Sequence, residues 1–111
     1  MKRRNFQSSE NIFKQGEPAD RAFLLVEGEV AFFQGRDRIL DVGRGRFFGD
    51  LQLFKNGSYP ATAVTLEPSI VIEFTAEELL DHLGSDREAL KNYLTDVEDR
   101  VEELLEMLIK R

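Results

Sequence analysis

Short apolar runs separated by turn residues fill the first two thirds of the chain. Glycine or proline stands between these runs about every eight to twelve residues, a spacing typical of an antiparallel β-sandwich or barrel. We therefore predict a mainly β domain of the double-stranded β-helix (jelly-roll) barrel type over about residues 5–74, after a loose polar lead-in over residues 1–10. The strands are expected at residues 11–15, 22–27, 29–34, 39–42, 61–66 and 69–74.

The pattern changes to a helical one at Thr75. Thr75-Ala76-Glu77-Glu78 is a capping box, in which a hydroxyl opens a helix and a carboxylate follows three residues later. A short helix is expected over about residues 76–83, ended by Gly84. Ser85-Asp86-Arg87-Glu88 repeats the box, and no glycine or proline follows it. We therefore predict a long helix over about residues 86–110, and the whole chain, residues 1–111, as a single domain.

The predicted long helix carries apolar residues at alternating spacings of four and three. This is a heptad seam, whereas a helix that lies on its own domain usually shows a wider apolar stripe. We favour pairing with the same helix of a second chain, and keep packing on the chain's own domain as the alternative. The seam consists of Leu90, Leu94, Val97, Val101, Leu104 and Leu108.

Composition and charge exclude several classes of function. The net charge is -6, and residues 67–111 hold thirteen acidic and five basic residues, which argues against a nucleic acid as partner. The chain has no cysteine and a single histidine, His82, so neither a thiol nucleophile nor a histidine metal cluster is expected. No apolar run approaches the ~20 residues that span a membrane. We expect a cytoplasmic protein that is not an enzyme.

One segment, Gly45-Arg46-Phe47-Phe48-Gly49-Asp50-Leu51, interrupts the strands. A glycine that opens a short helix lets an anion approach the first N–H groups, which have no partner within the helix. The sequence thus predicts a phosphate cradle, although many strand–loop–helix turns share this pattern.

Several segments together resemble the cyclic nucleotide-binding domain family. Asn11 to Asp20 is similar to the first strand and turn of that family, and Leu24-Leu25-Val26-Glu27-Gly28-Glu29-Val30 to its glycine-bent hairpin. Gly45 to Leu51 resembles the start of its phosphate-binding cassette, and Ala61-Thr62-Ala63-Val64 the strand that follows. The resemblance covers about residues 5–108 and implies a regulatory module with a β-roll and a C-terminal helix that reports ligand binding.

The resemblance implies a ligand site in two parts. The N–H groups from Asp50 through Leu51 to Gln52 would hold the cyclic phosphate, Gly49 would let the backbone close on it, and the carboxylate of Asp50 would accept a ribose hydroxyl. The second part is Tyr59, Pro60, Ala61 and Thr62.

This sequence departs from the family pattern at both parts of the site. Asp50 stands in place of a glutamate and Gln52 in place of a small residue. Tyr59 occupies the position of the arginine that neutralises the phosphate, and no arginine lies between Arg46 and Arg87. Pro60 stands where cyclic GMP binders carry a hydroxyl, which favours cyclic AMP over cyclic GMP.

Two functions remain open on these grounds. The first is a regulatory module that binds a cyclic nucleotide or a related phosphate weakly at Gly49–Gln52. The second is a degenerate module that binds no nucleotide and serves homodimerisation or another protein contact. The methionine at position 1 slightly favours a stand-alone module over a fragment of a longer protein.

Overall fold

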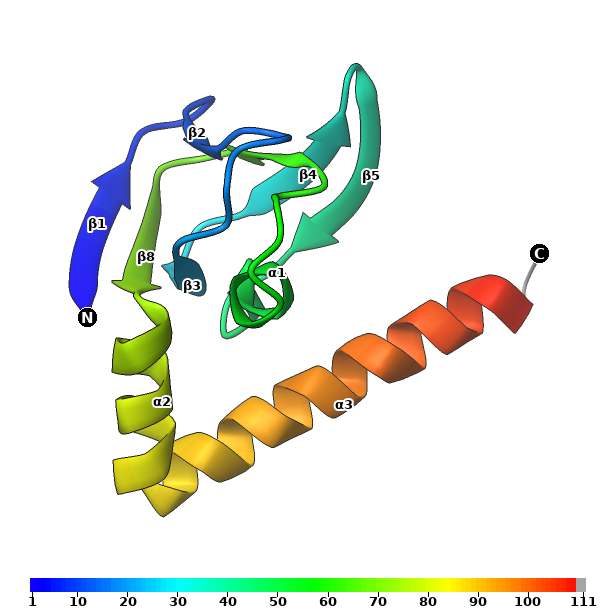
Figure 1. The fold of residues 1–111 in the computed structure, drawn as a ribbon. Coiled ribbons are helices and arrows are strands. Elements are labelled where there is room, and N and C mark those ends of the chain that lie inside the picture. The colour runs from blue at the N-terminus through cyan, green and yellow to red at the C-terminus, as the bar shows by residue number, and fades with distance from the viewer. Residues whose placement is uncertain (110–111) are drawn as a thin grey trace. The chain divides into compact units, whose positions relative to one another are not determined.

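The computed structural model describes residues 1–109, which fall into two compact units, Met1–Leu79 and the residues from Leu80 onward. Two antiparallel sheets form the first unit (Figure 1). In the described part of the chain each sheet has four strands, and neither closes into a barrel. The first has the order β1 (Lys2–Phe6), β8 (Ser69–Phe74), β3 (Ala22–Glu27) and β6 (Phe47–Phe48). The second has the order β2 (Asn11–Phe13), β7 (Thr62–Thr65), β4 (Val30–Gln34) and β5 (Asp37–Val42).

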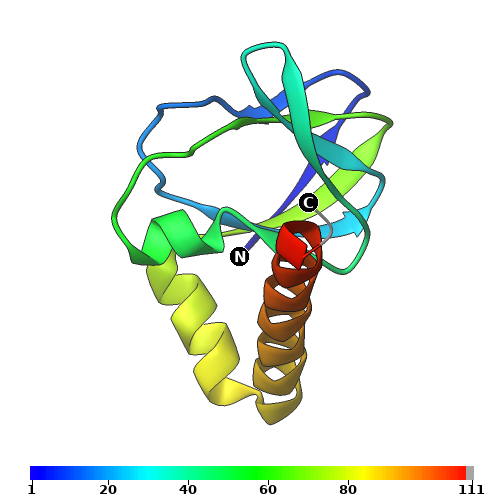
Figure 2. The same ribbon diagram turned by 90° about the vertical axis from the view of Figure 1, so that its right-hand side faces the viewer.

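The mainly β, jelly-roll prediction is confirmed at the level of two packed antiparallel sheets. The predicted strands 22–27 and 69–74 agree with β3 and β8. β5 begins at Asp37, two residues before its predicted start, because Asp37 pairs with Gln34 at the hairpin end. Figure 2 shows that the β4–β5 hairpin reaches beyond the neighbouring strands of its sheet.

The prediction of a loose lead-in over residues 1–10 is wrong for its first half. Lys2–Phe6 forms β1, which pairs antiparallel with β8 from Lys2↔Glu73 to Phe6↔Ser69. The backbone pairing and the burial of Phe6, which is 7% exposed, stabilise a strand whose other side chains are polar. The polar composition of this segment therefore led to a wrong prediction, because the strand that it pairs with lies far away in the sequence.

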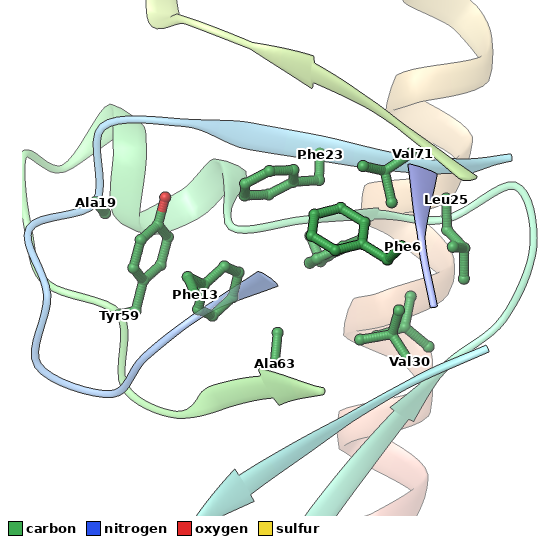
Figure 3. Close-up of a cluster of buried hydrophobic side chains, with 11 residues drawn as sticks. Phe6, Phe13, Ala19, Phe23, Leu25, Val30, Tyr59, Ala63 and Val71 are labelled. Carbon is green, nitrogen blue, oxygen red and sulfur yellow. The ribbon is translucent and has the colours of Figure 1, made fainter. Parts of the chain in front are cut away.

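Side chains of both sheets meet between the two layers and form the core (Figure 3). Alternation along the strands produces this arrangement, since successive side chains point to opposite faces of a sheet. Leu25, Val30, Ala63 and Val71 are completely buried. The core comprises Phe6, Phe13, Ala19, Phe23, Leu25, Val30, Val42, Phe48, Tyr59, Ala63 and Val71.

The short helix α2 (Ala76–Ser85) begins at the predicted capping box. The N–H of Glu78 donates to Thr75 Oγ1 over 3.2 Å, and the N–H of Thr75 donates to Glu78 Oε1 over 2.8 Å. The predicted stop at Gly84 is wrong, because α2 includes Gly84 and ends at Ser85. One glycine lowers helix propensity by about 1 kcal/mol, which the last turn tolerates.

The long helix α3 (Arg87–Ile109) has 23 residues and is ~35 Å long at the usual rise per residue. Its first turn is capped by Asp86, whose Oδ1 accepts hydrogen bonds from the N–H groups of Glu88 (3.0 Å) and Ala89 (3.2 Å). Ser85 does not act as the expected cap, since its hydroxyl donates to the carbonyl of His82. The predicted end at Lys110 lies outside the described residues.

No helix among residues 1–109 is both long and apolar enough to cross a membrane. Assignment of the whole chain to a single domain stays a prediction.

Candidate functional site

The predicted cradle begins at Gly49, between the end of β6 and the short helix α1 (Asp50–Phe54). Gly49 has φ +77°, the left-handed conformation that side chains disfavour. A Cβ atom there would lie 3.3 Å from the carbonyl oxygen of Arg21 and 3.4 Å from Tyr59 Cε1. Conformation and close approach therefore both require glycine at this position.

The three residues after Gly49 have different exposures. Asp50 is completely buried, Gln52 is half-buried, and Leu51 is 49% exposed. The carboxylate of Asp50 belongs to the first residue of α1, where the helix dipole favours a negative charge. The structure thus places the predicted ribose contact in the interior of the protein.

Tyr59, in the second part of the predicted site, lies in the interior of the protein. Its side chain is 3% exposed, and its ring lies parallel to that of Phe13 with 3.8 Å between the centroids and 11° between the planes. Its hydroxyl donates to the carbonyl oxygen of Arg21 over 2.7 Å and accepts from the Arg21 N–H over 3.2 Å. Figure 3 shows the ring beside Phe13 with the hydroxyl pointing away from it. Burial raises the pKa of the Tyr59 hydroxyl, so this side chain is neutral at pH 7.

Backbone hydrogen bonds join the loop around Tyr59 to the loop between β2 and β3. The N–H of Tyr59 donates to Glu17 over 3.0 Å, and its carbonyl accepts from Gly16 over 2.8 Å. The N–H of Ala19 donates to Gly57 over 2.9 Å. Together with the hydroxyl bonds to Arg21, these contacts fix Tyr59 at three points of the neighbouring loop.

A cluster of aromatic rings fills the interior beside Gly49. Phe13 lies 5.8 Å from Phe23, 5.9 Å from Phe32 and 6.1 Å from Phe48, measured between ring centroids. Phe23 and Phe48 are 5.2 Å apart and nearly parallel. Rings at these separations pack favourably and exclude water. Phe13, Phe23 and Phe32 lie on different strands, β2, β3 and β4, so the cluster could not be predicted from local sequence.

Two of the remaining predicted site residues, Pro60 and Thr62, make hydrogen bonds that hold neighbouring segments together. The carbonyl of Pro60 accepts a hydrogen bond from Gln34 Nε2 over 3.1 Å, and the hydroxyl of Thr62 accepts one from the N–H of Gln15 over 3.0 Å. Ala61 is 1% exposed. The structure therefore brings Gly49 and Tyr59 together, while Pro60 and Thr62 connect neighbouring strands and loops.

A groove on the outer side of Tyr59 was not predicted from the sequence. It has a volume of about 470 Å³, and Gly49–Gln52 are not among its lining residues. Glu73 binds Arg4 over 3.0 Å and lies 3.8 Å from the guanidinium of Arg21, so two positive charges face this carboxylate. The groove is lined by Arg4, Ile12, Phe13, Glu17, Pro18, Asp20, Arg21, Phe23, Tyr59 and Glu73.

The heptad seam of α3 lies on the surface of its unit. Leu94 is 56%, Val101 51%, Leu104 58% and Leu108 63% exposed, which is high for aliphatic side chains. Leu90 is 39% exposed and Val97 is half-buried. These fractions describe a single chain and leave the apolar face open to a partner.

No group of three or more histidine, cysteine, aspartate or glutamate side chains within residues 1–109 is placed to hold a metal ion.

Comparison with known proteins gives consistent matches. The model of the cyclic nucleotide-binding domain matches residues 3–86. The CRP-like cAMP-activated global transcriptional regulator of Mycobacterium tuberculosis is 29% identical over 112 residues, covering 96% of this chain and 45% of the regulator. The cAMP-dependent protein kinase regulatory subunit of Debaryomyces hansenii is 27% identical, covering 86% of this chain and 22% of that protein. The chain thus spans less than half the length of these relatives.

Solved structures agree on the fold. The catabolite activator protein of Thermus thermophilus matches this chain with a TM-score of 0.78 at 23% identity. The match covers 96% of this chain and 53% of that one. A cyclic nucleotide-binding protein from Geobacter metallireducens matches with a TM-score of 0.69 at 25% identity, covering 94% and 78% of the two chains. The jelly-roll arrangement is therefore shared with these proteins.

Proposed function

Because this chain belongs to the cyclic nucleotide-binding domain family, we propose that it is a regulatory module whose nucleotide position is filled by its own side chains. It acts through protein contact, first of all with a second copy of itself. The relatives are regulatory proteins, namely a transcriptional regulator and a kinase regulatory subunit. By analogy we assign this chain a regulatory role and no catalytic one.

The burial of Tyr59 carries this proposal. The family resemblance aligns Tyr59 with the arginine that neutralises the phosphate, and a tyrosine brings no positive charge. A hydrogen bond to a charged group contributes about 1.5–3 kcal/mol, so its loss weakens phosphate binding by roughly ten- to a hundredfold. Tyr59 also stacks on Phe13 and binds Arg21, so a ligand would have to displace a packed ring.

Weak binding of a cyclic nucleotide is the second candidate function. Gly49 keeps the left-handed turn that opens α1, and the first N–H groups of a helix have no partner within it and can bind an anion. Cyclic AMP suits this candidate better than cyclic GMP, because Pro60 lacks a side-chain hydroxyl. This second candidate function requires the ring of Tyr59 to move out of its stack on Phe13.

Thermal unfolding with and without nucleotide separates the two candidates. A ligand at a hundred times its dissociation constant stabilises a fold by about 2.7 kcal/mol. We expect no shift of the melting temperature with millimolar cyclic AMP or cyclic GMP, and a shift with cyclic AMP in Tyr59→Arg. A clear shift in the unmodified protein would favour the second candidate. Tyr59→Phe is the matched control, since it keeps the ring and adds no charge.

The seam of α3 is the contact surface in this proposal. Six apolar residues at heptad spacing bury their side chains when two such helices pack as a coiled coil. Leu94, Val101 and Leu108 occupy one of the two core positions, and Leu90, Val97 and Leu104 the other. Their exposure in the single chain supports pairing over a role inside their own unit.

Sedimentation of two lysine variants tests the pairing. Leu94→Lys places a charge in the seam, whereas Asn92→Lys places the same charge two residues earlier, at an exposed position off the seam. We expect Leu94→Lys to dissociate the dimer and Asn92→Lys to leave it intact. Equal behaviour of the two variants would overturn the assignment of the seam.

The absence of cysteine from the sequence is compatible with a reducing compartment. We accordingly place the module in the cytoplasm, and we assign it no nucleic-acid contact because residues 67–111 are strongly acidic.

A further inference from the structure

The outer face of the sheet β1-β8-β3-β6 is unusually apolar for a surface. Leu25 and Val71 point into the core and are completely buried, so their neighbours along the strands point to the opposite, outer face. An antiparallel sheet with one solvated face normally carries polar residues at these outward positions. Here they are Leu24 and Val26 of β3, and Ile70 and Ile72 of β8.

These four side chains, which we call the outer patch, are incompletely covered. Val26 is 43% exposed, and Leu24, Ile70 and Ile72 are half-buried. Further along the same face the sheet is closed, since the ring of Phe74 packs 6.3 Å from that of Phe47 and both are buried. The outer patch is thus the open part of an otherwise covered face.

Register places one charge on each side of the outer patch. Arg3 of β1 is the cross-strand neighbour of Ile72, whose other neighbour is Leu24. The register of β3 shifts between Leu25 and Glu27, so that Glu27, and not Val26, is the neighbour of Ile70 on the opposite side of β8. Both charged residues are exposed, and in the described part of the chain neither takes part in an ion pair. The patch therefore has a positive border along β1 and a negative border along β3.

A two-fold axis parallel to β8 would exchange these two borders. Under such an axis, β1 of one copy faces β3 of the other, and Arg3 comes opposite the border that carries Glu27. The apolar centre meets its own equivalent, as an isologous interface requires. Sheets that pack face to face interdigitate side chains of this kind.

From this arrangement we propose that the outer patch is a second self-association surface, on which two copies pack sheet against sheet. Ile70 and Ile72 form its centre, and Arg3 of each copy pairs with Glu27 of the other. The outer patch shares no residue with the seam of α3, and a chain that uses the two surfaces with different copies forms assemblies larger than a dimer. Four aliphatic side chains make a small interface, and its occupancy rises with protein concentration.

Charge reversal offers a sharp test, carried out on the full chain with Leu94→Lys and Val101→Lys to remove seam pairing. In this background sedimentation should still show a dimer at high concentration. R3E alone and E27R alone should each raise its dissociation constant about tenfold, because two exposed ion pairs become repulsive in each dimer. An equimolar mixture of the two variants should restore association, since every Arg and Glu then meets an opposite charge.

Ile72→Lys in the same background should yield monomers, with an unchanged circular dichroism spectrum as evidence of folding. Lysine can extend its charge to solvent from a half-buried position, so the fold should persist. A background variant that is monomeric at all concentrations would overturn the proposal. So would a dimer whose dissociation constant is unchanged by R3E and by E27R. If the unmodified chain and the seam variant assemble equally, the seam proposal fails while the outer patch stands.

Discussion

The hydroxyl of Tyr59 donates a hydrogen bond to the carbonyl oxygen of Arg21 over 2.7 Å, and it accepts one from the N–H of the same residue. The side chain thereby satisfies both backbone groups of Arg21 in the loop before β3. The ring meanwhile stacks on Phe13. A residue that family resemblance places at a ligand contact thus has a full set of partners within the chain.

Removal of this hydroxyl should lower stability. Tyr59→Phe keeps the ring stack but removes the hydrogen-bond partner of two partly buried backbone groups of Arg21, at a cost of about 1–3 kcal/mol. Tyr59→Ala should cost about 3–5 kcal/mol, because it leaves a cavity beside Phe13. Urea unfolding measures both changes. Phe54→Ala, at a side chain that is 39% exposed, serves as the surface control and should change the free energy of unfolding far less. Equal effects of Tyr59→Phe and Phe54→Ala would contradict the structural role of the hydroxyl.

The destabilisation caused by Gly→Ala at three glycines with positive φ should increase as the space around the glycine decreases. Gly45→Ala meets nothing within 4 Å and should cost only the left-handed strain, about 1–2 kcal/mol. Gly49→Ala adds a contact 3.3 Å from the carbonyl of Arg21 and should cost more. Gly28→Ala should be the most destabilising, because its Cβ would overlap the side chain of Ser69 and lie 2.8 Å from the carbonyl of Pro68.

The check is a urea series on the three variants at one pH. A flat series would show that the left-handed strain alone sets the cost, and that close packing around Gly49 has no effect.

Glu73 should matter more than an equally paired surface carboxylate. Its side chain is 14% exposed and binds Arg4 over 3.0 Å, whereas Asp41 is 61% exposed and binds Arg38 over 2.7 Å. Glu73→Gln leaves two partly buried guanidinium groups with a weaker partner, and we expect a loss of about 1–2 kcal/mol. Asp41→Asn should change stability by less than about 1 kcal/mol. Thermal unfolding of the two variants tests the contrast, and the reverse order would refute it.

The carboxylate of Glu78 should make stability depend on pH. Hydrogen bonds from the amino terminus of Met1 and from the N–H of Thr75 lower the pKa of Glu78 to about 2. A lowered pKa in the folded state means that the charged form stabilises the fold above the normal pKa of the group. This contribution is lost as the pH falls through the folded value. The stability difference between the wild type and Glu78→Gln should be constant near neutral pH and shrink between about pH 4.5 and 2.

NMR titration of the Glu78 side chain provides the direct measurement. Glu77 is exposed and makes neither of the two capping-box hydrogen bonds, so Glu77→Gln is a matched control for the loss of one charge. A normal pKa for Glu78 would remove the basis of the predicted pH dependence.

The sequence predicted most strands because their local patterns agree with their final environment. Ala22–Glu27 and Ser69–Phe74 are apolar runs bounded by turn residues, and both form strands with these bounds. The family resemblance was also sufficient to predict the glycine turn at Gly49. β1 was not predictable in this way, because its pairing depends on β8, more than sixty residues away.

The interior of the site was harder to predict than its backbone. The missing arginine was visible in the sequence, but the place that Tyr59 takes instead depends on Phe13 and Arg21. Their contact follows from the packing of β2 and the loop before β3, for which no local pattern exists. Likewise, Ile70 and Ile72 look like ordinary strand residues until the register shows that they point outward.

We propose above all that Tyr59 fills the position where this family binds a nucleotide. Amide NMR spectra recorded during a titration with cyclic AMP test it most directly, with the signals of Gly49 to Gln52 and Tyr59 as reporters. The account predicts no saturable shifts of these signals at millimolar nucleotide, and shifts of the cradle signals in Tyr59→Arg. Saturable shifts of Gly49 to Gln52 in the unmodified protein, with movement of the Tyr59 signal, would contradict it.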